Sequence, residues 1–221
     1  MFKDVLDIYN RNLLDILFLM VLVILPVTSL IFLAIIYFGI EFDGELSVFF
    51  VGYSIIINFI ICLPPFLWLT LKDLNDEKAG LKKCLAFFAT QFGPLLFTTF
   101  LFYSIAIYTS WMMLVPTIII LLFTMIYPFF SDFPTLKEMF IQAKNKIFEE
   151  NIAIVVDLII ITSTLVLLWA GMTYFMQNFD NNIISFMLIR SLLNMVIFPF
   201  LYIYLTLRYR DTEEEFTMIN V

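Results

Sequence analysis

Six long apolar runs, separated by short polar segments, dominate the chain. They cover residues 13–39, 47–71, 87–108, 112–130, 152–176 and 183–207. A helix needs about 20 mostly apolar residues to cross the hydrocarbon layer of a bilayer, so each run is long enough for one crossing. The pattern predicts an all-α, polytopic membrane protein whose residues 1–221 form a single domain with six transmembrane helices.

A second pattern appears in three segments that begin at Phe2, Leu81 and Leu136. In each segment apolar residues recur at offsets 0, 3, 4, 7 and 11, which follow one face of an α-helix. Each segment precedes an odd-numbered apolar run. We therefore expect three helical hairpins, each preceded by a cytoplasmic amphipathic segment, with the second segment merging into its transmembrane helix.

A proline followed by Phe occurs near the end of each even-numbered run, at Pro65, Pro128 and Pro199. Proline lacks a backbone N–H, so we expect each of them to tilt or end its helix. Their recurrence indicates that the hairpin is repeated three times. The alternative is chance similarity among apolar helices, because the copies match by position rather than residue by residue.

Eleven of the twelve Lys and Arg residues lie before run one, between runs two and three, between runs four and five, or after run six. Basic residues concentrate on the cytoplasmic side of membrane proteins, so both termini are expected in the cytoplasm. The amphipathic segments are expected to lie on the inner leaflet, with their lysines toward anionic lipids. The alternative is that they bind a cytoplasmic partner such as an ATPase.

Composition removes several classes of function. Hydrophobic residues make up 62% of the chain, against about 45–50% in soluble domains. The net charge is −7 and there is no histidine, and no basic surface pattern suggests nucleic acid. No catalytic, phosphate-binding or metal-binding motif is present. We expect neither an enzyme nor a cofactor.

Arg190 is the one basic residue placed within a predicted span, with Asn194 one helical turn later. Charged groups inside a bilayer are costly and often functional, so this pair could bind an anionic headgroup or a substrate carboxylate. Alternatively, Arg190 extends to the outer interface or joins two helices. Asn58 is expected to form a hydrogen bond between helices.

Asp157 begins a polar stripe on the fifth run that includes Thr164 and Gly171, and we expect this stripe to pack inward. Asp15 lies at a similar depth in the first run. The two carboxyl groups could relay protons. Alternatively, they are hydrated or paired with Arg11 or with one of two lysines, Lys144 and Lys146.

Three stretches of the chain resemble the YesL family of six-span bacterial membrane proteins. They are LPVTS at residues 25–29, LNDEKAGLKKCLAFFATQFGPLL at 74–96 and IYPFFSDFPTLKEMFIQAKNKIFEENI at 126–152. The resemblance covers roughly residues 10–175. It implies a bacterial plasma membrane and a link to sugar uptake, and it supplies no functional residues.

The ending FPFLYIYLTLRYR is also similar to the last span of the membrane domain attached to some glycerophosphodiester phosphodiesterases.

Two functions are expected as alternatives. One is a non-enzymatic accessory or scaffold subunit of a membrane complex such as a sugar ABC importer. The other is a small transporter or permease, including one for peptide export or immunity, with Arg190, Asn194, Asp157 and Thr164 lining its path.

Overall fold

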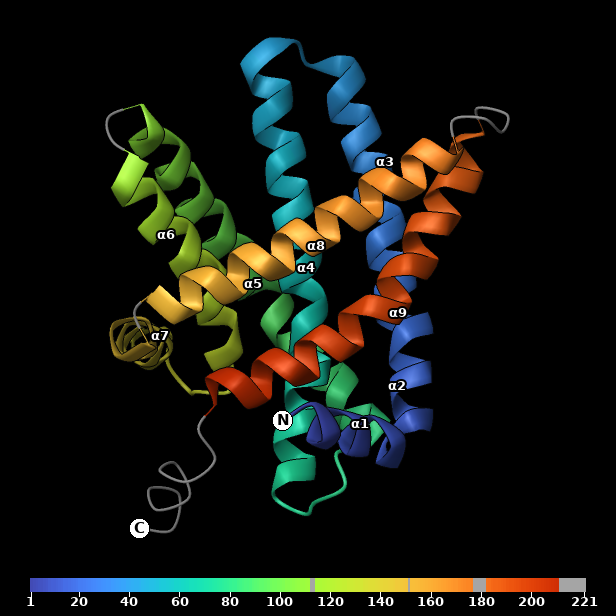
Figure 1. Ribbon diagram of the computed structural model, residues 1–221, viewed down its shortest axis with the longest axis vertical. Coiled ribbons are helices and arrows are strands. Elements are labelled where there is room, and N and C mark those ends of the chain that lie inside the picture. The colour runs from blue at the N-terminus through green and yellow to red at the C-terminus, as the bar shows by residue number, and fades with distance from the viewer. Residues whose placement is uncertain (112–113, 151, 177–181, 211–221) are drawn as a thin grey trace.

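The computed structural model describes residues 1–111, 114–150, 152–176 and 182–210 (Figure 1). Within these ranges every regular element is helical, which confirms the all-α prediction. The elements are α1 (Phe2–Arg11), α2 (Leu13–Leu19), the π-helical η1 (Met20–Ile24), α3 (Leu25–Glu41), α4 (Gly44–Leu74), α5 (Leu81–Ser110), α6 (Leu114–Ile126), the 3-10 helix η2 (Tyr127–Phe130), α7 (Leu136–Glu150), α8 (Ile152–Met176) and α9 (Ile183–Tyr209).

Five helices are long and apolar enough to cross a membrane. They are the continuous helix Leu13–Glu41, Gly44–Leu74, Leu81–Ser110, Ile152–Met172 and Ile183–Tyr209. The chain is therefore a multi-pass membrane protein. The remaining predicted span is the fourth in chain order, at 112–130. There the structure has the shorter apolar helix Leu114–Phe130. Residues 112–113 of that run lie outside the described residues. The α-helical part has 13 residues, about 20 Å at 1.5 Å per residue, and it ends where the chain tightens into the 3-10 helix Tyr127–Phe130.

The first and third amphipathic segments form helices, as the spacing predicts. α7 buries Met139 and Ala143 of its predicted apolar face. In α1 only Val5 of the predicted face is buried, whereas Phe2 and Leu6 are exposed. The second buried residue of α1, Ile8, lies outside the predicted positions. The middle segment has no helix of its own, because α5 runs without a break from Leu81. This continuity confirms that the second segment merges into its transmembrane helix.

The core surrounds the second half of α4. Every residue from 57 to 67 is buried, and the helices that pack against α4 are α3, α5 and α9. The first half of α4 and the second half of α3 extend beyond this core as a hairpin at the top of Figure 1. A helix that is apolar and enclosed on all sides is typical of the centre of a bundle.

The three repeat prolines are buried but act differently. Pro128 lies in η2, where α6 ends. Pro65 lies inside α4, which continues to Leu74, and Pro199 lies inside α9, which continues to Tyr209. The expectation that proline tilts its helix fits α9, which bends along its length in Figure 1. Neither Pro65 nor Pro199 ends its helix.

α8 is the least enclosed of the long helices. It runs obliquely across the face of the bundle seen in Figure 1, and its main contacts are with α7 and α9. Among its described side chains only Ile154 and Leu158 are buried. The expected inward stripe is wrong at Thr164, which is exposed, and a side chain at Gly171 would meet nothing within 4 Å.

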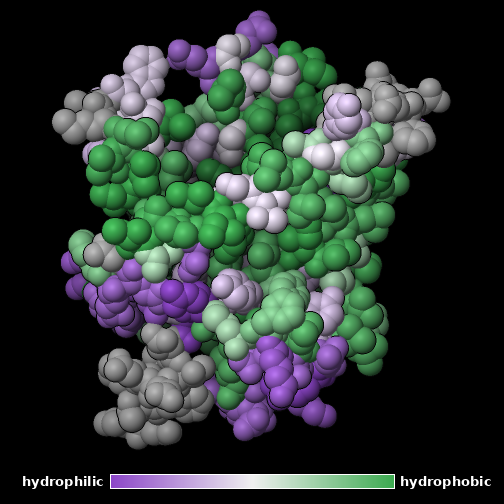
Figure 2. All heavy atoms as spheres, viewed as in Figure 1, coloured by the Kyte–Doolittle hydropathy of each residue, from purple (hydrophilic) through white to green (hydrophobic). Residues whose placement is uncertain are grey.

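The surface has a layered distribution of polarity. Figure 2 shows a broad hydrophobic band, with a hydrophilic region below it that includes the place where Figure 1 has α7. Apolar side chains dominate the exposed residues of the long helices, such as Leu30 on α3 and Val196 on α9. An apolar band of this kind is suited to a hydrocarbon environment.

Candidate functional site

Three polar side chains from three helices meet in the interior of the bundle. The Asn194 Nδ2 atom on α9 donates to the Thr28 Oγ1 atom on α3 at 3.3 Å, and that hydroxyl donates to the Asn58 Oδ1 atom on α4 at 3.2 Å. All three side chains are buried. The prediction that Asn58 joins helices by a hydrogen bond is confirmed.

Arg190 and Asn194 both face α3, as their spacing of one turn predicts. The Arg190 guanidinium lies 5.0 Å from the centroid of the Phe32 ring, close enough for a cation–π contact. Between them, the Ser191 Oγ and Ser29 Oγ atoms are 3.2 Å apart. Arg190 is half-buried. Together these contacts join α3 and α9 over about one helical turn.

Asp157 is on α8 and lies beside the C-terminal end of α9, away from Arg190. Its Oδ2 atom accepts a hydrogen bond from the Arg208 Nε atom at 3.2 Å. Arg208 also contacts Glu150, whose Oε1 atom is 3.0 Å from the Lys146 Nζ atom. These four side chains form a charged network that joins α7, α8 and α9. The structure therefore separates Asp157 from Arg190, which lies five turns earlier on α9.

Asp15 joins neither group. It is half-buried on α2, and no hydrogen bond or ion pair connects it to any residue within the described ranges. Arg11 was one of the alternative partners for Asp157 and Asp15, but among the described residues its Nη2 atom lies 2.5 Å from the Asp73 Oδ2 atom instead. That contact raises the pKa of Arg11, first through the hydrogen bond and then through the charge of Asp73.

Thr164 is exposed, and its hydroxyl bonds within its own helix. Its hydroxyl donates to the Ile160 carbonyl one turn earlier at 2.7 Å. The hydroxyl of Thr162 does the same toward Leu158. Hydroxyl groups in membrane helices often satisfy themselves in this way, so these residues are not tied into the bundle.

The most extensive polar contact of the bundle was not expected from the sequence. Arg210 follows α9, and its two terminal nitrogens lie 2.5 and 2.8 Å from the two Asp132 carboxylate oxygens. It also donates to the Phe129 carbonyl at 3.3 Å, and its guanidinium lies 5.4 Å from the Phe130 ring centroid and 5.1 Å from that of Phe133. The sequence places Arg210 among the cytoplasmic basic residues, and nothing local indicates that it is buried.

Both cysteines, Cys62 and Cys84, are buried free thiols, consistent with packing residues. Among the residues that the structure describes, no three acidic or cysteine side chains converge in a way that could hold a metal ion. No known protein family, curated protein or solved structure matches this chain. Any functional proposal therefore rests on the geometry of the chain itself.

Replacing Asn194 by leucine is expected to lower the free energy of unfolding by about 1 kcal/mol, because hydrogen bonds between membrane helices contribute about 0.6–2 kcal/mol each. Unfolding in detergent by a chemical denaturant would measure this change. Val196→Leu, on the exposed face of the same helix, is the matched control. A double-mutant cycle with Thr28→Val should show coupling. Strictly additive effects would contradict a structural role for the Asn194–Thr28 contact.

Proposed function

We propose that this chain is a non-enzymatic accessory or scaffold subunit that binds another membrane protein laterally through α8. The observation that carries the proposal is the exposure of α8. It is held to its own chain near one end, by Ile154, Leu158 and the ion pair of Asp157 with Arg208. Most of its remaining described side chains, including Val166 and Leu167, are exposed.

Lipid alone could cover an apolar helix, but the middle of α8 carries the exposed polar residues Thr162, Ser163 and Thr164. Small and hydroxyl-bearing residues are enriched where membrane helices pack against each other. Their exposure favours a helix of a partner protein as the group that covers this surface.

The interior polar residues support the same proposal. Thr28, Asn58 and Asn194 form hydrogen bonds with one another, which favours a role in holding the helices together. We further propose that Leu114–Phe130 is a sixth span, giving three hairpins with both termini in the cytoplasm of a bacterial plasma membrane. The resemblance to the YesL family adds a sugar ABC importer as the proposed partner complex.

A mild-detergent pull-down of the tagged protein from its native membranes, analysed by mass spectrometry, tests this proposal. We expect a membrane protein at near-equal stoichiometry. Thr164→Trp should reduce its recovery about tenfold, equivalent to about 1.4 kcal/mol of binding free energy. Leu30→Trp, on the exposed surface of α3, is the matched control and should leave recovery unchanged. Purification of a lone monomer, or equal losses with both variants, would contradict the proposal.

The alternative is a small transporter or permease, including one for peptide export or immunity. It rests on Arg190, a half-buried charge within α9 that faces α3. This proposal has less support, because Asp157 and Thr164 lie outside the contacts that Arg190 and Asn194 make. Loss of a transport or resistance phenotype in Arg190→Leu, at unchanged abundance, would favour it over the scaffold.

A further inference from the structure

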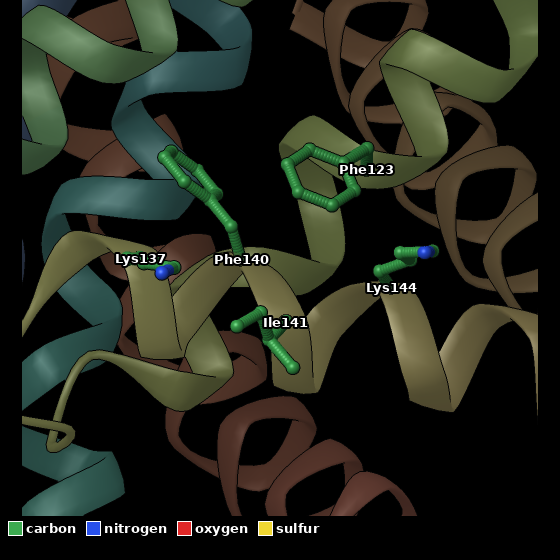
Figure 3. Close-up of a pocket in the computed structure, with 5 residues that line it drawn as sticks. All are labelled: Phe123, Lys137, Phe140, Ile141 and Lys144. Atoms are coloured by element: carbon green, nitrogen blue, oxygen red, sulfur yellow. The ribbon is translucent and has the colours of Figure 1, made fainter.

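A pocket of about 520 Å³ lies between α6 and α7 (Figure 3). Phe123 of α6 forms one wall, and Phe140 and Ile141 of α7 form the other. Lys137 and Lys144 lie at the two ends of this row of α7 residues in Figure 3. The pocket thus combines apolar walls with a basic group at each end.

The two lysines are available to a ligand. Both are exposed, and neither forms an ion pair with a residue that the structure describes. Lys144 has only an aromatic contact, with its Nζ atom 5.9 Å from the Phe148 ring centroid. Lys146 differs, because it is buried and paired with Glu150. α7 therefore has one lysine that stabilises the fold and two exposed lysines at the rim of the pocket, whose flexible side chains can turn toward a ligand.

The spacing of the two lysines suits a headgroup. Lys137 and Lys144 are seven residues apart, so they lie on one face of α7 about 10 Å apart along its axis. Each ammonium group is on a flexible four-carbon chain, so both can approach one phosphate between them. The apolar side chains beside them would meet an acyl chain.

The position of the pocket matches the edge of the membrane. Phe123 lies in the last turn of α6, and Figure 1 shows α7 across the lower end of α6. In Figure 2 this part of the molecule has hydrophilic atoms directly below the hydrophobic band. A phospholipid has its phosphate at this boundary and its acyl chains in the band.

We propose that this pocket binds an anionic glycerophospholipid, with the headgroup phosphate between Lys137 and Lys144 and an acyl chain against Phe123, Phe140 and Ile141. The site is independent of the partner-binding role of α8. It gives the chain a specific lipid ligand on its cytoplasmic side, in addition to general contact with the bilayer.

The test uses the full chain in nanodiscs of equal parts phosphatidylglycerol and phosphatidylcholine. After extraction in mild detergent, native mass spectrometry counts the lipids that stay bound. We expect phosphatidylglycerol to be retained in preference to phosphatidylcholine. Lys137→Gln with Lys144→Gln should lower that preference about thirtyfold, which corresponds to about 1 kcal/mol for each lysine near a lipid surface. Lys137→Arg with Lys144→Arg should retain it.

The matched control is Lys78→Gln with Lys82→Gln, which removes the same charge from exposed positions just before α5 and in its first turn. An equal loss in this control would mean general surface attraction and would overturn the site. Ile141→Glu, at an exposed position of the pocket wall, should also reduce retention at an unchanged melting temperature. Retention that persists in this variant, or displacement by glycerol phosphate at equal concentration, would overturn the acyl-chain contact.

Discussion

Replacing Asp132 by alanine is expected to lower the free energy of unfolding by about 3 kcal/mol. The Asp132 carboxylate accepts two hydrogen bonds from Arg210, whose side chain is only 7% exposed. Removing one member of a buried charged pair costs about 3–5 kcal/mol, because the remaining charge stays in a poorly solvated position. We expect a cost at the lower end of this range, because the Asp132 side chain is 19% exposed. Chemical unfolding in detergent would measure the change.

Two further variants make this prediction specific. Asp7→Ala removes an exposed acid from α1 and should change the free energy of unfolding by less than about 0.5 kcal/mol. The double variant Asp132→Leu with Arg210→Met removes both charges and should be closer to the wild type than Asp132→Ala. If Asp132→Ala were as stable as Asp7→Ala, the pair would have no structural role.

The position of this pair explains the expected size of its effect. Arg210 follows α9, and Asp132 follows η2, so the contact attaches the last helix to the end of α6. Phe129 packs its ring on Tyr209 in the same place, with 5.3 Å between centroids. Loss of the carboxylate would weaken a junction between two hairpins rather than a single helix.

The sequence predicts most of the helices because length and hydrophobicity are local properties. The runs at 13–39 and 183–207 correspond to Leu13–Glu41 and Ile183–Tyr209, with small differences at the ends. The point at which α6 ends within the fourth run depends on how the backbone turns at Pro128. A helix can continue through a proline, as α4 does at Pro65, or end near one, as α6 does at Pro128. The sequences around the two prolines are too similar to predict which outcome occurs.

The packing of α8 could not be predicted, because its apolar residues are distributed all round the helix. Such a sequence favours no face. The expectation that Thr164 faces inward therefore rested only on its small polar side chain. The hairpins differ accordingly. α3 packs against α4, and α5 against α6, whereas α8 and α9 make few contacts with each other. Threefold repetition of the hairpin stays a prediction.

Ion-pair partners were the least predictable part of the candidate site. Asp157 and Arg208 are 51 residues apart in the chain, and the sequence offered closer basic residues as partners. The contacts of Asn194 were more accessible to prediction, because its spacing from Arg190 fixes a shared helix face. What joins that face to Thr28 is the antiparallel packing of α9 on α3, which no local pattern specifies.

Replacing Glu150 by alanine is expected to lower the free energy of unfolding by about 3 kcal/mol. Its carboxylate lies 3.0 Å from the Lys146 Nζ atom and 2.5 Å from the Arg208 Nη2 atom. Arg208 would keep its contact with Asp157, but Lys146, whose side chain is 7% exposed, would lose the Glu150 carboxylate. Most of the cost therefore comes from a buried ammonium group without a countercharge from Glu150.

Glu149→Ala is the matched control, because Glu149 is the preceding residue on α7 and is exposed. Glu150→Gln should fall between the control and Glu150→Ala, since the amide oxygen can still accept a hydrogen bond from Lys146. Chemical unfolding of all three variants in the same detergent would measure these differences. Equal stability of Glu149→Ala and Glu150→Ala would show that the network does not hold α7 to α9. In that case the ion pair of Asp157 with Arg208 would remain the main polar attachment of α8.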